Sequence, residues 1–232
     1  MIRSLKQRVD EPELLDDPGI PEGELIDNLK ELEWINRLLG GHAITISGLK
    51  GLIGGDRSRT WTITDLGCGG GDTLRAISHW AGKHQIPVRL VGIDLNPACI
   101  RYAQRASQSY NIEWICADFR EAIPADTDIL INSLFCHHLD DSSLKELLLL
   151  MKNKARRGFV INDLQRHQVA FASIWILTRL LNGSRLVRHD APLSVARSFH
   201  RHEWLTRLSE AGLASSRLSW RWAFRWQVVY EK

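Results

Sequence analysis

The chain has 232 residues, of which 44% are hydrophobic and 25% are charged. This composition predicts one soluble domain whose core is large enough to fold without disulfides or a structural metal. The most apolar run, residues 169–181, contains Arg179 and is shorter than the ~20 residues that span a bilayer, and no signal-peptide pattern opens the sequence. The four cysteines are widely spaced, which gives no zinc or disulfide pattern and predicts a cytoplasmic protein.

Charge is distributed unevenly along the chain, although the formal net charge is only +3. Residues 155–232 carry twelve arginines and one lysine against five acidic residues, so the first 154 residues are net negative. Two interpretations fit this pattern. One is a mobile acidic N-terminus together with a solvated basic face, and the other is a basic surface for an acidic partner or an anionic substrate.

The N-terminal part is predicted to be a helical extension covering residues 1–58. Residues 1–19 are expected to be irregular. Pro21 suits the first turn of a helix, and apolar residues recur at helical spacing over 21–39 until Gly40 and Gly41. A short helix is expected over 49–53. The extension either covers one side of a ligand cleft or only packs against the rest of the protein.

A strand over residues 61–65 leads into a glycine-rich turn, DLGCGGG at 65–71, and then into a helix predicted over 72–83. The glycines allow the backbone to approach a ligand closely. The next strand, 88–94, ends in Asp94, whose carboxylate suits the two hydroxyls of a ribose. A dinucleotide fingerprint requires glycine where this chain has Asp72. That carboxylate would repel a pyrophosphate and favour a cationic ligand.

Strands and helices continue to alternate beyond this point. Strands are predicted over 112–117, 129–133 and 158–163, and helices over 97–109, 142–154 and 170–181. Apolar strands separated by helices predict a mostly parallel sheet with helices on both faces, which binds ligands beyond the carboxyl ends of its strands. A helix near 203–211 precedes alternating apolar residues over 215–232, which predict a long strand or a hairpin.

The sequence of strand, acid, spaced glycines, helix, second strand and terminal acid resembles the first two motifs of class I methyltransferases. These enzymes bind S-adenosylmethionine, a sulfonium without phosphate. The resemblance covers residues from about 60 to 232. It implies an α/β, Rossmann-like fold with a seven-stranded, mostly parallel sheet and a C-terminal antiparallel hairpin. It also implies a methyltransferase domain over 59–232, a substrate-cover insertion at about 165–200, and S-adenosylhomocysteine as product.

The same resemblance implies which residues hold the cofactor. Asp118 and Phe119 match an acid that accepts the adenine amino group and an apolar neighbour of the ring, although Asp118 also suits a helix cap. Leu95 would rest on the adenine or the ribose. The complete predicted set is Asp65, Gly67, Cys68, Gly69, Gly71, Asp94, Leu95, Asp118, Phe119 and Ser133.

The fourth strand ends in NSLF at 132–135, where methyltransferases of amino groups in nucleic acids and proteins carry Asn/Asp-Pro-Pro-Tyr/Phe. Ser133 and Leu134 replace both prolines, which argues against adenine, cytosine or glutamine as acceptor. His137 and His138 follow, and imidazole is suited to taking a proton from a phenol or an enol. We expect His138, rather than His137, to be the catalytic base. A structural or substrate-binding role is the alternative, and no metal is expected.

Polar and aromatic residues after the fifth strand are the predicted substrate contacts. Arg166 and His167 would meet an acidic or phenolic group, while Phe171 and Trp175 would face an apolar ligand from a helical cover that breaks at residue 182 into a mobile basic loop. NDLQRH at 162–167, the aromatic helix and RHDAPLS at 188–194 resemble bacterial small-molecule methyltransferases associated with polyketide-type biosynthesis.

The predicted function is therefore S-adenosylmethionine-dependent methyl transfer to an oxygen, or less readily a carbon, of an apolar phenolic, quinone-like or polyketide molecule. The expected partners are this acceptor and a carrier protein. An RNA or protein methyltransferase is one alternative, but the missing prolines and the lack of an appended RNA-binding module argue against nucleic acid. A cofactor-binding scaffold is the non-enzyme alternative, because a fold alone does not establish catalysis.

Overall fold

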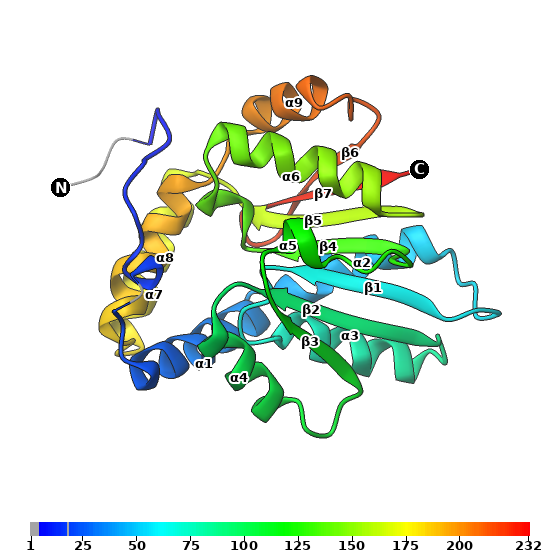
Figure 1. Ribbon diagram of the computed structural model, residues 1–232. Helices are drawn as coiled ribbons and strands as arrows, with labels where there is room; N and C mark the ends of the chain where they lie inside the picture. The colour runs from blue at the N-terminus through cyan, green and yellow to red at the C-terminus, as the bar shows by residue number, and fades with distance from the viewer. Residues whose placement is uncertain (1–4, 18) are drawn as a thin grey trace.

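A computed structural model describes residues 5–17 and 19–232. These residues contain a seven-stranded sheet with the order β3-β2-β1-β4-β5-β7-β6 (Figure 1). Neighbouring strands are parallel from β3 to β5 and antiparallel from β5 to β6, so the predicted Rossmann-like sheet is confirmed. The strands are β1 (Trp61–Leu66), β2 (Val88–Asp94), β3 (Ile112–Cys116), β4 (Ile129–Ser133), β5 (Gly158–Leu164), β6 (Arg217–Arg221) and β7 (Arg225–Glu231).

Helices cover both faces of the sheet. One face packs against α2 (Gly41–Ile53), α3 (Asp72–Lys83) and α4 (Pro97–Ala106), and the other packs against α5 (Phe119–Ala122), α6 (Asp141–Lys154) and α9 (Arg201–Glu210). Because both faces are covered, β1 is buried along its whole length and β5 is buried up to its last residue. None of the described helices is long and apolar enough to cross a membrane.

The N-terminal helices share the core of the sheet. Helix α1 (Glu22–Leu38) agrees with the prediction, but α2 begins at Gly41 instead of residue 49. Gly40 adopts a left-handed conformation with φ of 73°, which turns the chain and starts a second helix immediately. Leu49 and Leu52 of α2 pack in the same cluster as Ile63 of β1. The boundary predicted at residue 58 therefore does not divide the core.

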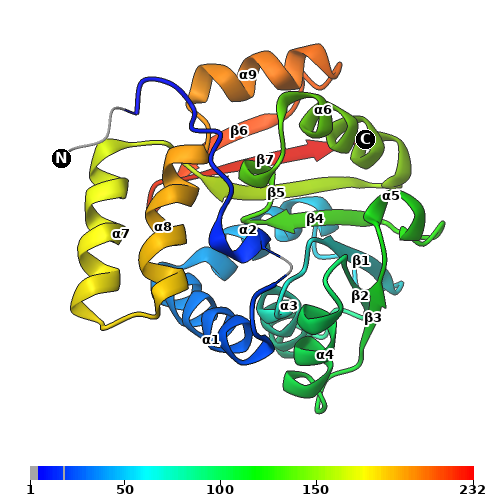
Figure 2. The same cartoon turned by 60° about the vertical axis from the view of Figure 1, so that its left-hand side comes forward.

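The predicted insertion is a helical hairpin made of α7 (Gln168–Leu180) and α8 (Arg185–Arg197), which lies beside α1 (Figure 2). The basic loop predicted after residue 182 is wrong, because this segment is helix α8. Its N-terminus is capped by Ser184, whose side chain accepts a hydrogen bond from the Val187 N–H. Helix α8 contains Pro192 and many polar residues, so the spacing of its apolar residues did not predict a helix.

Residues 5–17 form what we call the N-terminal strap, which runs along α8 to the centre of the molecule (Figure 2). The strap contains the short helix η1 (Leu14–Asp16). The N–H groups of Leu14 and Leu15 donate to the Asp190 carboxylate of α8 at 2.8 and 2.9 Å. Irregular backbone was predicted here and is confirmed, but the interpretation of this acidic segment as mobile is wrong, because its polar groups are bonded to α8.

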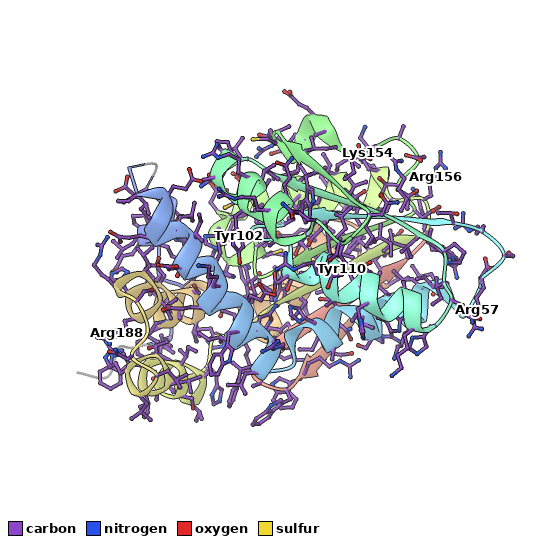
Figure 3. The ribbon with its side chains drawn as sticks, turned by 90° about the horizontal axis from the view of Figure 1, so that it is seen from below. Arg57, Tyr102, Tyr110, Lys154, Arg156 and Arg188 are labelled. Carbon is purple, nitrogen blue, oxygen red and sulfur yellow. The ribbon has the colours of Figure 1, made fainter. Side chains whose placement is uncertain are left out.

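Basic side chains occur at both ends of the molecule. Arg57 and Arg156 lie at one end of the molecule, and Arg188 lies at the opposite end (Figure 3). Three arginines of the basic C-terminal part are buried instead: Arg166, Arg197 and Arg225, with relative exposures of 0%, 7% and 2%. Much of the C-terminal positive charge therefore has internal roles.

Helix α2 lies unusually close to the sheet at Gly48. A Cβ atom at this position would lie 2.7 and 2.8 Å from the two Cγ atoms of Val160. We expect Gly48→Ala to push the helix away from β5 and to lower the free energy of unfolding by about 1–3 kcal/mol. The matched control is Gly51→Ala in the same helix, where a Cβ would meet only flexible Arg217 at 3.6 Å. The control should leave stability unchanged or raise it by up to about 1 kcal/mol. Urea unfolding of both variants measures the difference, and equal effects would contradict the close approach.

Candidate active site

A cavity of about 600 Å³ opens at the carboxyl ends of β1, β2 and β4. Its walls come from the glycine-rich turn, from the two histidines after β4 and from α1, α7, α8 and the N-terminal strap. The segment 222–225 between β6 and β7 closes a further side. This is the position at which parallel α/β sheets bind ligands.

The glycine-rich turn is tied to the end of β2 by Asp94. One oxygen of the Asp94 carboxylate accepts the Gly69 N–H at 2.8 Å, and the other accepts the Asn96 N–H at 2.9 Å. Burial raises the pKa of Asp94, and these two hydrogen bonds oppose the rise. Gly67 has φ of 69°, and a Cβ there would collide with the Phe135 ring at 2.3 Å. The turn thus needs glycine both for its conformation and for space.

Asp65 is buried at the end of β1 with one carboxylate oxygen that has no hydrogen-bond partner among the described residues. Burial raises its pKa well above the usual value, and the neighbouring Asp72 and Asp94 raise it further. Asn28 and Asn36 of α1 also line the cavity with unpaired buried polar atoms. Buried polar groups normally have partners, so this side of the cavity can form hydrogen bonds with a polar ligand group.

Eight of the predicted site residues line the cavity: Asp65, Gly67, Cys68, Gly69, Asp94, Ser133, His137 and His138. Four predicted cofactor residues do not. Gly71 is the N-cap of α3, Leu95 is 71% exposed, and Phe119 packs edge-on against Phe135 at 5.7 Å. Asp118 caps α5 by accepting the Arg120 N–H at 2.9 Å. Their contacts with an adenine stay a prediction.

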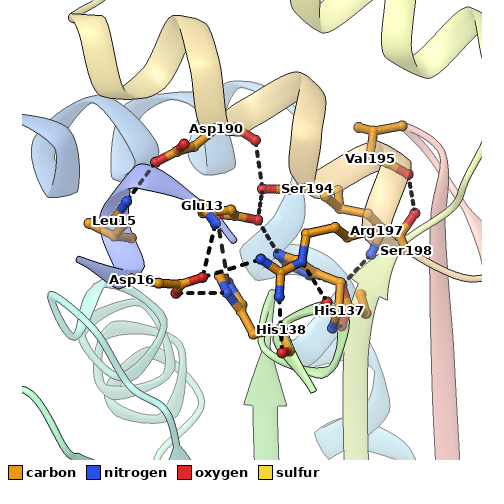
Figure 4. Close-up of polar contacts among 12 residues, drawn as sticks. Glu13, Leu15, Asp16, His137, His138, Asp190, Ser194, Val195, Arg197 and Ser198 are labelled. Carbon is orange, nitrogen blue, oxygen red and sulfur yellow. Dashed lines mark hydrogen bonds and ion pairs between the residues drawn. The ribbon is translucent and has the colours of Figure 1, made fainter. Parts of the chain in front are cut away.

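The two histidines differ in their environment (Figure 4). The His137 side chain is 3% exposed, and its Nδ1 lies 2.7 Å from Asp163 Oδ1. The other Asp163 oxygen accepts the His137 backbone N–H at 3.0 Å. Burial raises the pKa of Asp163, but the charge and hydrogen bond of His137 outweigh this effect and lower it. Asp163 therefore fixes the His137 ring, whereas the His138 side chain is 23% exposed.

The strap completes this cluster with two acidic residues that were not predicted as site residues. Glu13 lies 3.8 Å from His137 Nε2 and 3.9 Å from His138 Nε2, and it accepts a hydrogen bond from Ser194 Oγ at 2.8 Å. Burial raises the pKa of Glu13, while His138 and Ser194 oppose the rise. Asp16 lies 3.4 Å from His138 Nδ1. His138 is thus placed between two carboxylates at the cavity wall.

Buried Arg197 of α8 holds the strap and the histidine segment together (Figure 4). Its guanidinium donates to the carbonyl oxygens of His137 and His138 at 3.3 and 3.0 Å. It also donates to the Glu11 carbonyl at 3.0 Å and to the Asp16 carboxylate at 3.2 Å. One side chain therefore sets the position of both histidines relative to the acidic residues that face them.

Glu13, His137 and His138 offer donor atoms within 4.8 Å of one another, a grouping that could hold a metal ion. Ligands bonded to zinc at about 2.0–2.1 Å in a tetrahedron lie about 3.4 Å apart. The separations of 3.8 and 3.9 Å between Glu13 and the imidazoles are larger, so a metal would require the three groups to move together. The expectation of a site without metal stays a prediction.

The structure corrects the predicted substrate contacts. Arg166 is fully buried and donates to the carbonyls of Leu5 and Ser198 and to the Glu203 carboxylate, at 3.1, 2.6 and 2.6 Å. Because these hydrogen bonds use the donors of its guanidinium, Arg166 holds the strap in place and does not bind a substrate. His167 caps α7 by accepting the Val169 N–H, and its ring stacks on Phe224.

Helix α7 borders the cavity, but with a different face from the one predicted. Ala170, Ser173 and Ile174 line the cavity. Phe171 and Trp175 line a separate groove with Pro192 and Leu193 of α8. Because the apolar residues of α7 surround much of the helix, their spacing did not identify the side that faces the ligand.

A family model matches part of the chain. Residues 63–158, which include the glycine-rich turn, Asp94 and both histidines, match a family model described as a methyltransferase domain. No curated protein sequence matches the chain.

Several solved structures share the architecture. A SAM-dependent methyltransferase from Aquifex aeolicus is 17% identical over 89% of this chain and 97% of that chain, with a TM-score of 0.57. The plantazolicin methyltransferase BpumL in complex with SAH is 16% identical over 85% and 79%, with a TM-score of 0.63. Human N-acetylserotonin methyltransferase in complex with SAM is 15% identical over 91% and 56%, with a TM-score of 0.62. The present chain spans little more than half of this human enzyme.

At these identities the likeness shows a shared fold, which is that of class I methyltransferases. Residues 63–158 match the model of a methyltransferase domain. Together the two findings support an enzyme that uses S-adenosylmethionine as its cofactor. Asp65 and Asp94 line the cavity, and their contacts with this cofactor stay a prediction.

Replacing Asp94 should weaken cofactor binding. Asp94→Ala removes the acceptor for a ribose diol and one anchor of the glycine-rich turn. Hydrogen bonds to a charged group contribute about 1.5–3 kcal/mol each, so we expect the dissociation constant for S-adenosylhomocysteine to rise by roughly 10–100-fold. Titration calorimetry measures this change. Asp126→Ala, an exposed position paired with Arg89, is the control, and equal affinities for both variants would refute the assignment.

Removing the Asp190 carboxylate should release the strap from α8. In Asp190→Ala, the N–H groups of Leu14 and Leu15 lose their acceptors, and leaving buried donors unpaired costs about 1–3 kcal/mol. We expect hydrogen exchange over residues 8–17 to accelerate by at least tenfold while exchange in β1 and β4 stays slow. Mass spectrometry resolves the two regions. Unchanged exchange in the strap would show that Asp190 does not hold it.

Proposed function

We propose that the protein transfers a methyl group from S-adenosylmethionine to an oxygen of an apolar small molecule, such as a phenolic or polyketide-type metabolite. The observation that carries this proposal is the position of His138. It lies at the end of β4, on the wall of the cavity that also contains the glycine-rich turn, and it has Asp16 and Glu13 within 3.4 and 3.9 Å. A proton acceptor with stabilising carboxylates beside a cofactor pocket suits transfer to a hydroxyl group.

The shape and lining of the cavity support a small acceptor. A volume of about 600 Å³ falls within the range of small-molecule sites. Leu29, Leu32 and Ile35 of α1, Ile174 of α7 and Val195 of α8 supply apolar surface. Two solved structures with this fold are named for plantazolicin and N-acetylserotonin, which is consistent with a small acceptor here.

The chain's own residues would act by positioning, proton transfer and exclusion of water. S-adenosylmethionine, when bound, supplies a methyl group on a positively charged sulfur. His138 would take the proton of the acceptor hydroxyl as the oxygen attacks, and the carboxylates of Glu13 and Asp16 would stabilise the imidazolium. Asp163 keeps His137 in place beneath it. The strap and α8 cover the site and limit the access of water.

Two other functions give different experimental outcomes. An RNA or protein methyltransferase would label macromolecules, and a scaffold would bind the cofactor without transferring its methyl group. Incubation with labelled S-adenosylmethionine and separate pools of small-molecule extract, RNA and protein distinguishes the three. We expect label in the small-molecule pool. If acceptors are delivered on a carrier protein, label will appear on that carrier and will be released by cleavage of its thioester.

The proposed base can be tested directly. His138→Ala should lower the turnover number by roughly 10²–10⁴-fold and leave the affinity for S-adenosylhomocysteine almost unchanged. His79→Ala, an exposed residue of α3, is the matched control and should retain activity. His137→Ala removes the partner of buried Asp163 and should lower stability in addition to activity. Full turnover in His138→Ala would contradict the proposal.

A further inference from the structure

Arg225, the first residue of β7, is a buried cation without a partner. Its relative exposure is 2%. The Nε and Nη1 atoms are both buried and have no hydrogen-bond partner among residues 5–17 and 19–232. Most buried arginines are paired, because an uncompensated charge inside a protein is costly. In this same protein, buried Arg166 and Arg197 each form several hydrogen bonds. Arg225 is therefore an exception among the buried arginines of residues 5–17 and 19–232.

Arg225 is one of the residues that line the cavity, and its guanidinium lies beside helix α2. It approaches the start of α2, where a Cβ at Gly41 would lie 2.9 Å from Arg225 Nη1 and 1.7 Å from Asn36 Oδ1. The glycine at position 41 leaves the space that both polar side chains occupy. Asn36 Oδ1 is itself buried without a partner. Asn36 Oδ1 can only accept a hydrogen bond, whereas Arg225 Nε and Nη1 can only donate, so the guanidinium is the group here that can bind an anion.

The two acidic residues near Arg225, Asp163 and Asp72, are not its direct partners. Burial lowers its pKa to about 10, and Asp163 and Asp72 act in the opposite direction. The group is still protonated near neutral pH. The Asp163 carboxylate is bonded to His137, and the Asp72 carboxylate is bonded to His42 and Asn36. No acidic side chain in the described residues forms an ion pair with Arg225 within 4 Å.

We propose that Arg225 binds the carboxylate of a small molecule in the cavity. A guanidinium offers parallel N–H donors that match the two oxygens of a carboxylate, and the burial of Arg225 strengthens such a pair. This proposal rests on the proposed function, because methyl transfer brings two small molecules into the cavity. The carboxylate belongs either to the methionine part of the cofactor or to the acceptor. The second case would define the acceptor as an acid.

The first arm of the test concerns the cofactor. Calorimetry compares S-adenosylhomocysteine with 5′-deoxy-5′-(3-aminopropylthio)adenosine, which lacks only the carboxylate. If the cofactor supplies the carboxylate, the wild-type protein will prefer S-adenosylhomocysteine by at least tenfold, and Arg225→Met will lose that preference. Arg217→Met, an exposed position on β6, is the control and should keep the wild-type preference.

The second arm concerns the acceptor. The protein saturated with S-adenosylhomocysteine is titrated with benzoate and with benzamide, which has a similar shape without the charge. If the acceptor supplies the carboxylate, the wild-type protein will bind benzoate at least tenfold more tightly than benzamide, and Arg225→Met will bind both equally. Absence of a carboxylate preference in both arms overturns the proposal.

Thermal unfolding keeps the test independent of a folding defect. Without ligand, Arg225→Met removes an unpaired buried charge and should unfold at the same temperature as the wild type or higher. A large decrease would indicate a structural role and would overturn the proposal. Failure of the proposed function is a separate outcome. If the wild-type protein does not bind S-adenosylhomocysteine, methyl transfer is refuted. Titration of the ligand-free protein with benzoate and benzamide then still tests whether Arg225 binds a carboxylate.

Discussion

The organisation of this protein depends on how it compensates ionisable groups that are buried around one cavity. The Glu13 carboxylate is acceptable inside the protein because Ser194 and two imidazoles face it, and Asp163 is acceptable because His137 binds it. Asp65 and Arg225 keep unpaired atoms. Removing the partners of Glu13 or Asp163 would leave a desolvated charge. Paired groups therefore shape the cavity, and unpaired groups indicate where a ligand must supply what the chain lacks.

The sequence was most informative where local conformation and ligand binding require the same residues. The glycines at 67 and 69 and the acid at 94 lie within one strand–turn–helix–strand unit, so their contacts follow from short-range geometry. The alternation of apolar strands and helices predicted the mostly parallel sheet, whereas the closing hairpin followed from the resemblance to class I methyltransferases. Asp118 shows the limit of this approach, because its pattern fits both an adenine contact and the helix cap that the structure contains.

The missed features depend on contacts between distant segments. Glu13 and Asp16 resemble ordinary acidic surface residues until α8 supplies Ser194 and Arg197. Arg166 could not be distinguished from a substrate-binding arginine, because its partners are mainly backbone carbonyls that have no sequence signal. The cavity-facing side of α7 was assigned incorrectly because apolar residues surround much of this helix, and the packing of α8 decides which of them face the cavity.

The contacts between the strap and α8 also set the order of assembly. They join residues that are more than 170 positions apart, for example Leu14 with Asp190 and Glu13 with Ser194. During synthesis the strap leaves the ribosome before α8, and its binding surface on α8 does not exist until that helix is complete. The loop that its docking closes is among the longest in the chain, and long loops are closed late because of their entropy. We therefore expect the cluster of Glu13, Asp16 and the two histidines to form after most of the sheet is in place.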